Sequence, residues 1–113
     1  MSKVTIGIAS RARAKARMSA AFKGKAQGAF ICFDNVGLLW RVLTPKRWDL
    51  VRAVAGAGPQ GIRAIARKVG RDVKSVHGDV TALTKAGVLD RAADGKVEFP
   101  YDEIHVDFTL RAA

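Results

Sequence analysis

The pattern of apolar and polar residues changes its period along the chain. Near the start, Val4, Ile6 and Ile8 alternate with small or polar residues, and this period of two predicts a strand over residues 3–9. The apolar residues of 104–110 show the same period and predict a half-buried strand near the end. The pattern leaves open whether these two strands pair within one chain or between two chains.

The first third of the chain is predicted to alternate between strand and helix. An apolar run at Ala29–Phe33 predicts a further strand. Ser10 can cap a helix that continues to about Gly24, and a short apolar helix is expected over residues 36–43. Residues 1–43 are therefore expected to form a β-α-β extension and a lead-in helix.

The middle of the chain has the longer period of amphipathic helices. Thr44 and Pro45 predict the start of the first helix, because the hydroxyl can accept an N–H bond and proline lacks the N–H that would be left unpaired. The sequence GAGP at 56–59 ends it, and two further helices are expected over 62–70 and 72–86. In the third helix, the apolar residues fall on one stripe that is expected to face the core: Val73, Val76, Val80 and Leu83.

A hairpin is predicted directly after the third helix. Gly87 closes this helix, residues 88–91 and 96–99 have strand character, and Asp94-Gly95 supplies the turn between them. The helix over 62–70, a glycine-containing turn, the helix over 72–86 and the hairpin follow one another in the order of a winged helix-turn-helix. The predicted fold class is therefore α+β: a winged helix-turn-helix in residues 44–113 with an N-terminal β-α-β extension.

The charge is strongly positive and unevenly distributed. The 113 residues, enough for one domain with one modest core, include 20 Lys and Arg against 10 Asp and Glu. Residues 1–88 hold 17 basic and 4 acidic side chains, whereas residues 89–113 hold 3 and 6. A positive field over the first three-quarters of the chain favours phosphate groups as partners. We therefore expect double-stranded DNA as the main partner, and a role for the extension in dimerisation or in contacts with the DNA backbone.

The polar face of the third helix and the hairpin provide the expected DNA contacts. A helix that enters the major groove needs small residues for close approach, donors for base edges and positive charge for phosphates. Residues of these kinds lie opposite the apolar stripe of the third helix. The expected DNA-binding residues are Arg71, Lys74, Ser75, His77, Gly78, Thr81, Lys85 and Lys96.

Two acidic residues beside this face have structural interpretations. Asp72 stands at the start of the third helix, where its carboxylate is expected to cap free N–H groups. Asp79 lies between the apolar stripe and the polar face, and it is expected to pair with a nearby arginine such as Arg67.

The sequence also resembles one prokaryotic family, the MarR-like predicted transcriptional regulators. The resemblance covers roughly residues 28–110 and rests on LTPKRWDLVRAV, GPQGIRAIARKVGRDVKSVHGDVTALTKAGVL and GKVEFPYDEIHVDF, of which GRDVKSVHGDV and PYDEI are most specific. It implies a winged-helix DNA-binding module, usually dimeric and without enzymatic activity, and several members are antitoxins encoded beside a small toxin. Gly61 and Gly78 depart from the family, which commonly has a capping serine and a larger polar residue there.

Other classes of function find little support in the sequence. Cys32 is the only cysteine, so no internal disulfide can form and a reducing, cytoplasmic location is expected. No apolar stretch reaches the roughly 18 residues that a membrane span needs. Two isolated histidines and one cysteine do not make a metal site, and Asp102-Glu103 has no partner base for catalysis. We therefore expect neither an enzyme nor a metal or other cofactor.

The sequence favours a transcriptional regulator, specifically an autoregulating repressor that binds a palindromic operator as a homodimer. Two alternatives stay open: an antitoxin whose main role is to bind and neutralise a toxin protein, and, less favoured, an RNA-binding module. Sheet-type RNA binders expose aromatic residues on their strands. Four phenylalanines are instead predicted to lie in the core: Phe30, Phe33, Phe99 and Phe108.

Overall fold

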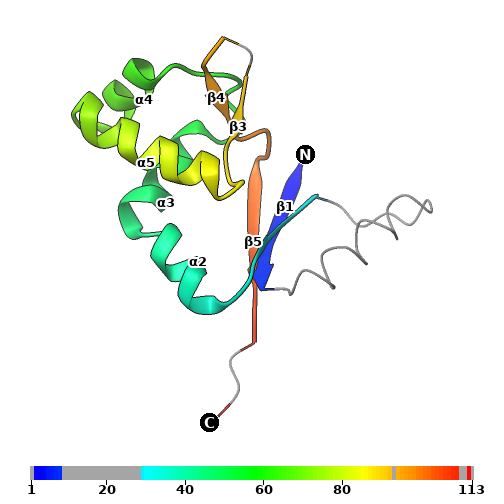
Figure 1. Cartoon of the computed structure of the whole chain (residues 1–113). Coiled ribbons are helices and arrows are strands. Elements are labelled where there is room, and N and C mark those ends of the chain that lie inside the picture. Colours follow the sequence, from blue (N-terminus) through cyan, green and yellow to red (C-terminus); the bar gives the residue numbers. More distant parts are fainter. Residues whose placement is uncertain (1, 9–28, 93, 110–111, 113) are drawn as a thin grey trace.

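The computed structural model describes residues 2–8, 29–92, 94–109 and 112, and these form an α+β domain of four helices and five strands (Figure 1). The helix predicted after Ser10 lies outside the described residues. In chain order the elements are β1 (Lys3–Ile8), β2 (Ala29–Phe33), α2 (Val36–Val42), α3 (Pro45–Val54), α4 (Ile62–Val69), α5 (Val73–Lys85), β3 (Asp90–Arg91), β4 (Val97–Glu98) and β5 (Glu103–Asp107).

A three-stranded parallel sheet joins segments from both ends of the chain. β1 is the central strand, with β2 on one side and β5 on the other. In this register Ile6 of β1 pairs with Ile31 of β2 and with Val106 of β5. The strands predicted near the two ends therefore pair with each other within one chain, and the later strand ends at Asp107.

One face of this sheet joins the helices in a single core. Val4, Ile6 and Phe33 are buried and belong to the same apolar cluster as residues of α3, α4 and α5. Burial of an apolar side chain of this size contributes roughly 1.5–3 kcal/mol. Segments on both sides of residue 43 therefore share one core.

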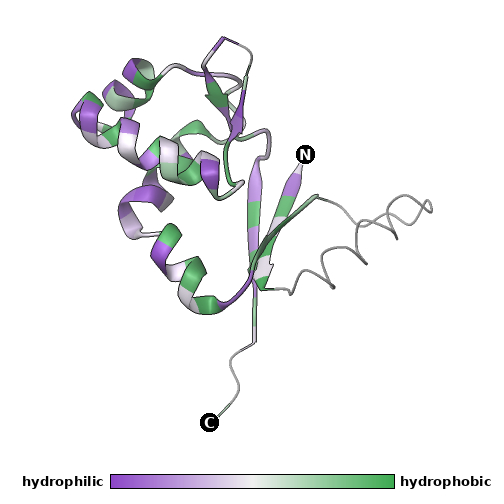
Figure 2. Ribbon diagram, viewed as in Figure 1, coloured by the Kyte–Doolittle hydropathy of each residue, from purple (hydrophilic) through white to green (hydrophobic). Residues whose placement is uncertain are grey.

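The helices begin and end at residues with local capping signals. Thr44 Oγ1 accepts a hydrogen bond from the Arg47 N–H at 3.4 Å at the start of α3, as predicted. Gly70, with a φ of 69°, ends α4 in the left-handed conformation that glycine favours. Hydrophilic and hydrophobic residues alternate along α4 and α5 in Figure 2, as expected for helices with one buried side. None of the described helices is long and apolar enough to cross a membrane.

β3 and β4 form an antiparallel hairpin near α4 (Figure 1). The hairpin turns at Asp94-Gly95 as predicted, and Gly95 has a φ of 84°. Val97 exchanges two backbone hydrogen bonds with Gln60, at 2.8 and 2.9 Å. The hairpin is thereby attached to the segment that precedes α4.

Three residues predicted to be buried are partly or largely exposed. The core prediction is wrong at Val73, which is 45% exposed because it is the first residue of α5 and lies beyond the buried part of that helix. Phe30 is half-buried, and its ring approaches Gly7 so closely that a Cβ there would lie 3.1 Å from Phe30 Cζ. Phe108 is also half-buried, because it follows the last strand, where its ring meets that of Trp40 edge to face at 5.7 Å.

Gly56 lies where the end of α3 meets the segment leading to β5. Its φ is 67°, and a Cβ at this position would lie 2.6 Å from Asp102 Oδ1. Asp102 is itself held in place, because its Oδ2 accepts a hydrogen bond from the Ser2 N–H at 3.3 Å and its own N–H donates to the Ser2 carbonyl at 3.0 Å. Glycine at this position thus lets β5 begin beside β1.

Gly56→Ala should therefore destabilise the protein more than Gly58→Ala. Gly58 also has a positive φ, of 77°, but a Cβ there would meet nothing within 4 Å. Both variants carry the left-handed backbone cost of roughly 1–2 kcal/mol, and only Gly56→Ala adds a steric clash. Urea denaturation should show a further loss of about 1 kcal/mol for Gly56→Ala, which disappears when both are compared in an Asp102→Ala background. Equal losses in the unmodified background would contradict this account.

Candidate nucleic-acid interface

Two local hydrogen bonds stabilise the turn between α4 and α5. After Gly70, the Arg71 N–H donates to the Ala66 carbonyl at 3.1 Å. Asp72 caps α5 as predicted, with Oδ2 accepting a hydrogen bond from the Ser75 N–H at 2.9 Å. This bond holds the pKa of Asp72 below its usual value, so the cap is ionised at neutral pH.

Asp79 fixes α5 to the rest of the helical unit through two arginines. Its Oδ1 accepts a hydrogen bond from Arg47 Nε of α3 at 3.1 Å, and its Oδ2 accepts one from Arg71 Nη2 at 2.7 Å. Arg47 Nη1 also donates to the Val42 carbonyl at the end of α2, at 3.0 Å. One carboxylate therefore connects α5 to α3, to the end of α2 and to the turn before α5.

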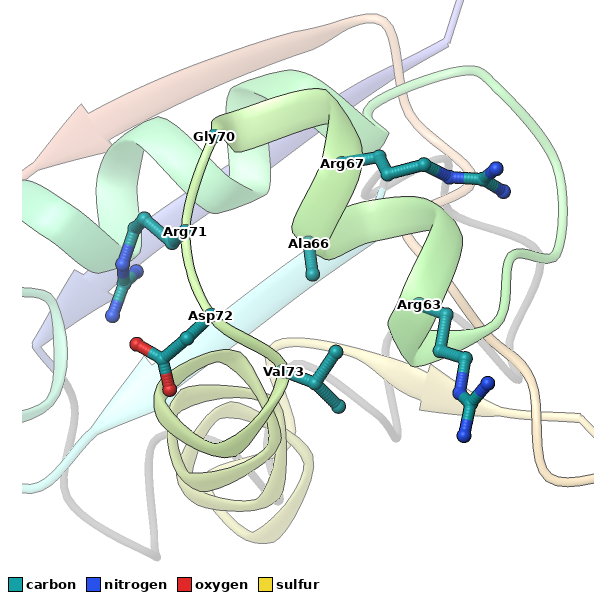
Figure 3. A pocket seen from close by; sticks show the side chains of 7 residues that line it. All are labelled: Arg63, Ala66, Arg67, Gly70, Arg71, Asp72 and Val73. Atoms are coloured by element: carbon teal, nitrogen blue, oxygen red, sulfur yellow. The ribbon is translucent and has the colours of Figure 1, made fainter.

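The partner predicted for Asp79 is wrong. Arg67 lies on α4, and its side chain points away from Asp72 and the start of α5 in Figure 3. Arg47 and Arg71 instead provide both hydrogen bonds to Asp79. Periodicity places Asp79 on the border of the buried stripe, but only the tertiary fold shows that Arg47 of α3 reaches it.

Two opposing effects act on the pKa of Asp79. Partial burial alone would raise it, but the hydrogen bonds and positive charges of Arg71 and Arg47 hold it below its usual value. The side chain is 17% exposed, and those of the arginines 23% and 22%. The ion pairs are therefore partly shielded from water, so removal of one partner would leave the others as poorly solvated charges.

The structure separates Arg71 from the other expected DNA-binding residues. Its Nη2 is committed to Asp79, and its Nη1 is buried without a hydrogen-bond partner among the described residues. We therefore assign Arg71 a positioning role in the turn.

The remaining expected contacts on α5 do lie on one side of the helix. Lys74, Ser75, His77, Gly78 and Lys85 are exposed, and Thr81 is half-buried. The Thr81 hydroxyl donates to the His77 carbonyl at 2.8 Å, so its free capacity is to accept. A Cβ at Gly78 would meet nothing within 4 Å, so packing within the described chain does not explain glycine there.

Basic residues of α4, which the sequence prediction missed, extend this surface. Arg63 and Arg67 project beside the hollow between α4 and α5 in Figure 3. A neighbouring hollow is lined by Arg67 and Lys68 of α4 together with Lys96 of the hairpin. Their signal in the sequence is the spacing of four between Arg63 and Arg67, which places both on one side of a helix.

Lys96 lies near the tip of the hairpin. Its N–H donates to Asp94 Oδ1 at 3.2 Å, and its Nζ lies 3.7 Å from Asp94 Oδ2. Both side chains are more than half exposed, at 52% and 60%, and such pairs contribute about 0–1 kcal/mol. The Lys96 ammonium group is therefore free to exchange this partner for a phosphate.

Comparison with protein families identifies the family of this chain. The model of the family named HVO_A0114 matches residues 42–106 of the 113-residue chain. The chain belongs to the HVO_A0114 family. No curated protein and no solved structure matches it.

The part that matches the HVO_A0114 family runs from the end of α2 into β5. It contains the Asp79 ion pairs, the turn before α5 and the whole hairpin, whereas β1 and β2 precede it. The resemblance to MarR-like regulators stays a prediction beside this membership. Among the described residues, no group of three or more His, Cys, Asp and Glu is placed to hold a metal ion.

Asp79→Asn should lower the free energy of unfolding by about 2 kcal/mol at pH 7, because two partly buried arginines lose their charged acceptor. Because the pKa of Asp79 is lowered by folding, this stabilisation is fully present above the pKa of the unfolded chain, about 3.9. It is lost as the pH falls through the lower pKa of the folded state.

The matched control is Asp49→Asn, since Asp49 is an exposed residue of α3 with no ion pair among the described residues. Urea denaturation of wild type and both variants between pH 3 and pH 7 measures the difference. An Asp79→Asn effect that equals that of Asp49→Asn, or that stays constant below pH 4, would show that the ion pairs do not stabilise the fold.

Proposed function

We propose that this protein is a winged helix-turn-helix protein that binds double-stranded DNA and regulates transcription, with no catalytic activity of its own. The observation that carries the proposal is a set of exposed basic side chains on α4, α5 and the hairpin. Lys96 is the only one of them that forms an ion pair within the described part of the chain. We call this set the basic surface: Arg63, Arg67, Lys68, Lys74, Lys85 and Lys96.

The order of the elements supports the winged-helix assignment. α3, α4 and α5 are followed by the β3–β4 hairpin, and the Gln60–Val97 bridge adds a third extended segment to it. In winged-helix proteins the helix in the position of α5 enters the major groove, and the hairpin contacts the backbone. The hollow shared by Arg67, Lys68 and Lys96 places the hairpin tip and α4 on one side of the molecule.

The dimensions and shape of α5 support duplex DNA as the ligand. Its 13 residues extend over roughly 20 Å, and a helix fits the major groove, which is about 12 Å wide. At Gly78 the backbone can approach the bases, because no side chain intervenes. The major groove of duplex RNA is too narrow to admit a helix in this way.

We further propose that the protein acts as a dimer and as an autoregulating repressor in the cytoplasm. One chain presents one α5, and two copies with helices about 34 Å apart would read the halves of a palindromic operator. Trp40 is 54% exposed and Val106 40% exposed, and neither belongs to α4, α5 or the hairpin. A second copy can therefore pack here without covering the basic surface. A toxin protein could use the same apolar side chains, which keeps the antitoxin role as the second candidate.

The dimer predicts a mass in solution of roughly 24 kDa, twice that of the 12.1 kDa chain. Light scattering at micromolar concentration should give this value for the wild type, and Trp40→Ser should shift the population towards monomer. A wild-type protein that stays monomeric both alone and with duplex DNA would contradict the dimer. Co-purification of a different small protein at equal stoichiometry would instead favour the antitoxin role.

Lys74→Ala should weaken binding to a cognate duplex, obtained by selection from random sequence, by about 1–3 kcal/mol if Lys74 contacts a base edge. Thermal unfolding should not change, because Lys74 is exposed. Arg52→Ala is the matched control: it also removes one positive charge, but Arg52 lines a separate hollow between α3 and β5. Thr81→Ala should matter less, since its hydroxyl already donates to His77.

The same titrations repeated at several salt concentrations test the electrostatic part of the proposal. The affinity of the wild type should fall steeply as salt rises, because each phosphate contact releases counterions. A slope near zero, or equal losses from Lys74→Ala and Arg52→Ala, would count against the basic surface. Tighter binding to single-stranded or duplex RNA than to duplex DNA would favour the RNA-binding alternative.

A further inference from the structure

Val73 is an exposed apolar residue in a basic environment. Three large hydrophobic residues of the described chain are exposed, and of these Val73 alone lies on α4, α5 or the hairpin. It is the first residue of α5, and it lines the hollow between the two helices together with Arg63, Ala66 and Arg67. In Figure 3 its side chain points away from α5 into this hollow, on the side where Arg63 projects.

The fold itself gives no reason for valine at this position. The core of α5 consists of Val76, Val80 and Leu83, which are at most 1% exposed, and Val73 stands outside it. β-branched residues are weaker helix formers than alanine or glutamate, and a glutamate in the first turn would also interact favourably with the helix dipole. An exposed valine here is therefore better explained by something outside the chain.

The chemistry of the major groove offers one apolar partner. Base edges present hydrogen-bond donors and acceptors, and the only apolar group among the four bases is the 5-methyl group of thymine. The first residues of a groove-entering helix are the ones that lie closest to base edges. Valine at the first position of α5, flanked by Lys74 and by the arginines of α4, has the apolar surface that such a methyl group requires.

We propose that Val73 is a specificity-determining residue that contacts the 5-methyl group of a thymine in the bound duplex. This inference rests on the proposed function, and it deepens it by naming a base and the atom that is recognised. It separates two tasks on one surface: the basic side chains other than Lys74 provide affinity for any duplex, and Val73 distinguishes thymine from the other pyrimidine.

The test removes one methyl group from the DNA at a time. In a cognate duplex obtained by selection, each thymine is replaced in turn by deoxyuridine, which keeps every hydrogen-bonding group and lacks only the 5-methyl. For the wild type, replacement of the one contacted thymine of a single half-site should weaken binding about fourfold, the factor expected for one buried methyl group. For Val73→Ala, binding should be weaker on the thymine duplex, and the same replacement should have no further effect.

Arg52→Ala is the matched control. Arg52 is exposed on α3 and lines a separate hollow between α3 and β5, so this variant should keep the full fourfold penalty. Thermal unfolding checks that Val73→Ala is folded, which is expected for an exposed position on a helix.

The outcomes distinguish the inference from the function on which it rests. The same uracil penalty in wild type and Val73→Ala would overturn the role of Val73, and so would a specific duplex in which no replacement has any effect. If no duplex is bound with sequence preference at all, the proposed function itself fails.

Discussion

The arrangement of the helical unit depends on the double ion pair of Asp79. A single carboxylate accepts hydrogen bonds from Arg47 of α3 and Arg71 of the turn, while Arg47 also reaches the carbonyl of Val42. Apolar contacts have no preferred direction, so they tolerate a small shift or rotation of a helix. The charged hydrogen bonds of 2.7 and 3.1 Å, by contrast, require a defined geometry. The position of α5 relative to α3 is therefore set by Asp79, and with it the direction in which the polar face of α5 points.

A division of labour among the basic residues follows from this arrangement. Arg47 and Arg71 form the ion pairs that hold α5, so they stabilise the fold, and their side chains are largely buried. The lysines and arginines of the basic surface, by contrast, have at most one exposed ion pair among the described residues. Among the described residues, α4, α5 and the hairpin thus carry several positive charges that no buried ion pair uses, and a polyanionic partner can bind to them.

Features that depend on neighbouring residues could be predicted from the sequence, and features that depend on distant ones could not. The caps by Thr44 and Asp72 and the turn at Asp94-Gly95 are local, and the structure has each of them. Helical periodicity gives the angle of Val73 around α5 but not its distance from the core, so it does not predict that Val73 is exposed. The parallel pairing of β1 with β5 and the choice of Arg47 as a partner of Asp79 need the tertiary fold.

Double-stranded DNA is proposed to bind at the basic surface. Titration of the ¹⁵N-labelled protein with a cognate duplex, followed by two-dimensional NMR, tests it residue by residue. We expect the largest shifts at the exposed positions of α5, at Arg63 and Arg67 of α4 and at Lys96, with amides of β5 unaffected beyond any effect of dimerisation. Shifts confined to the sheet, or no shifts at low salt with any duplex, would contradict the claim.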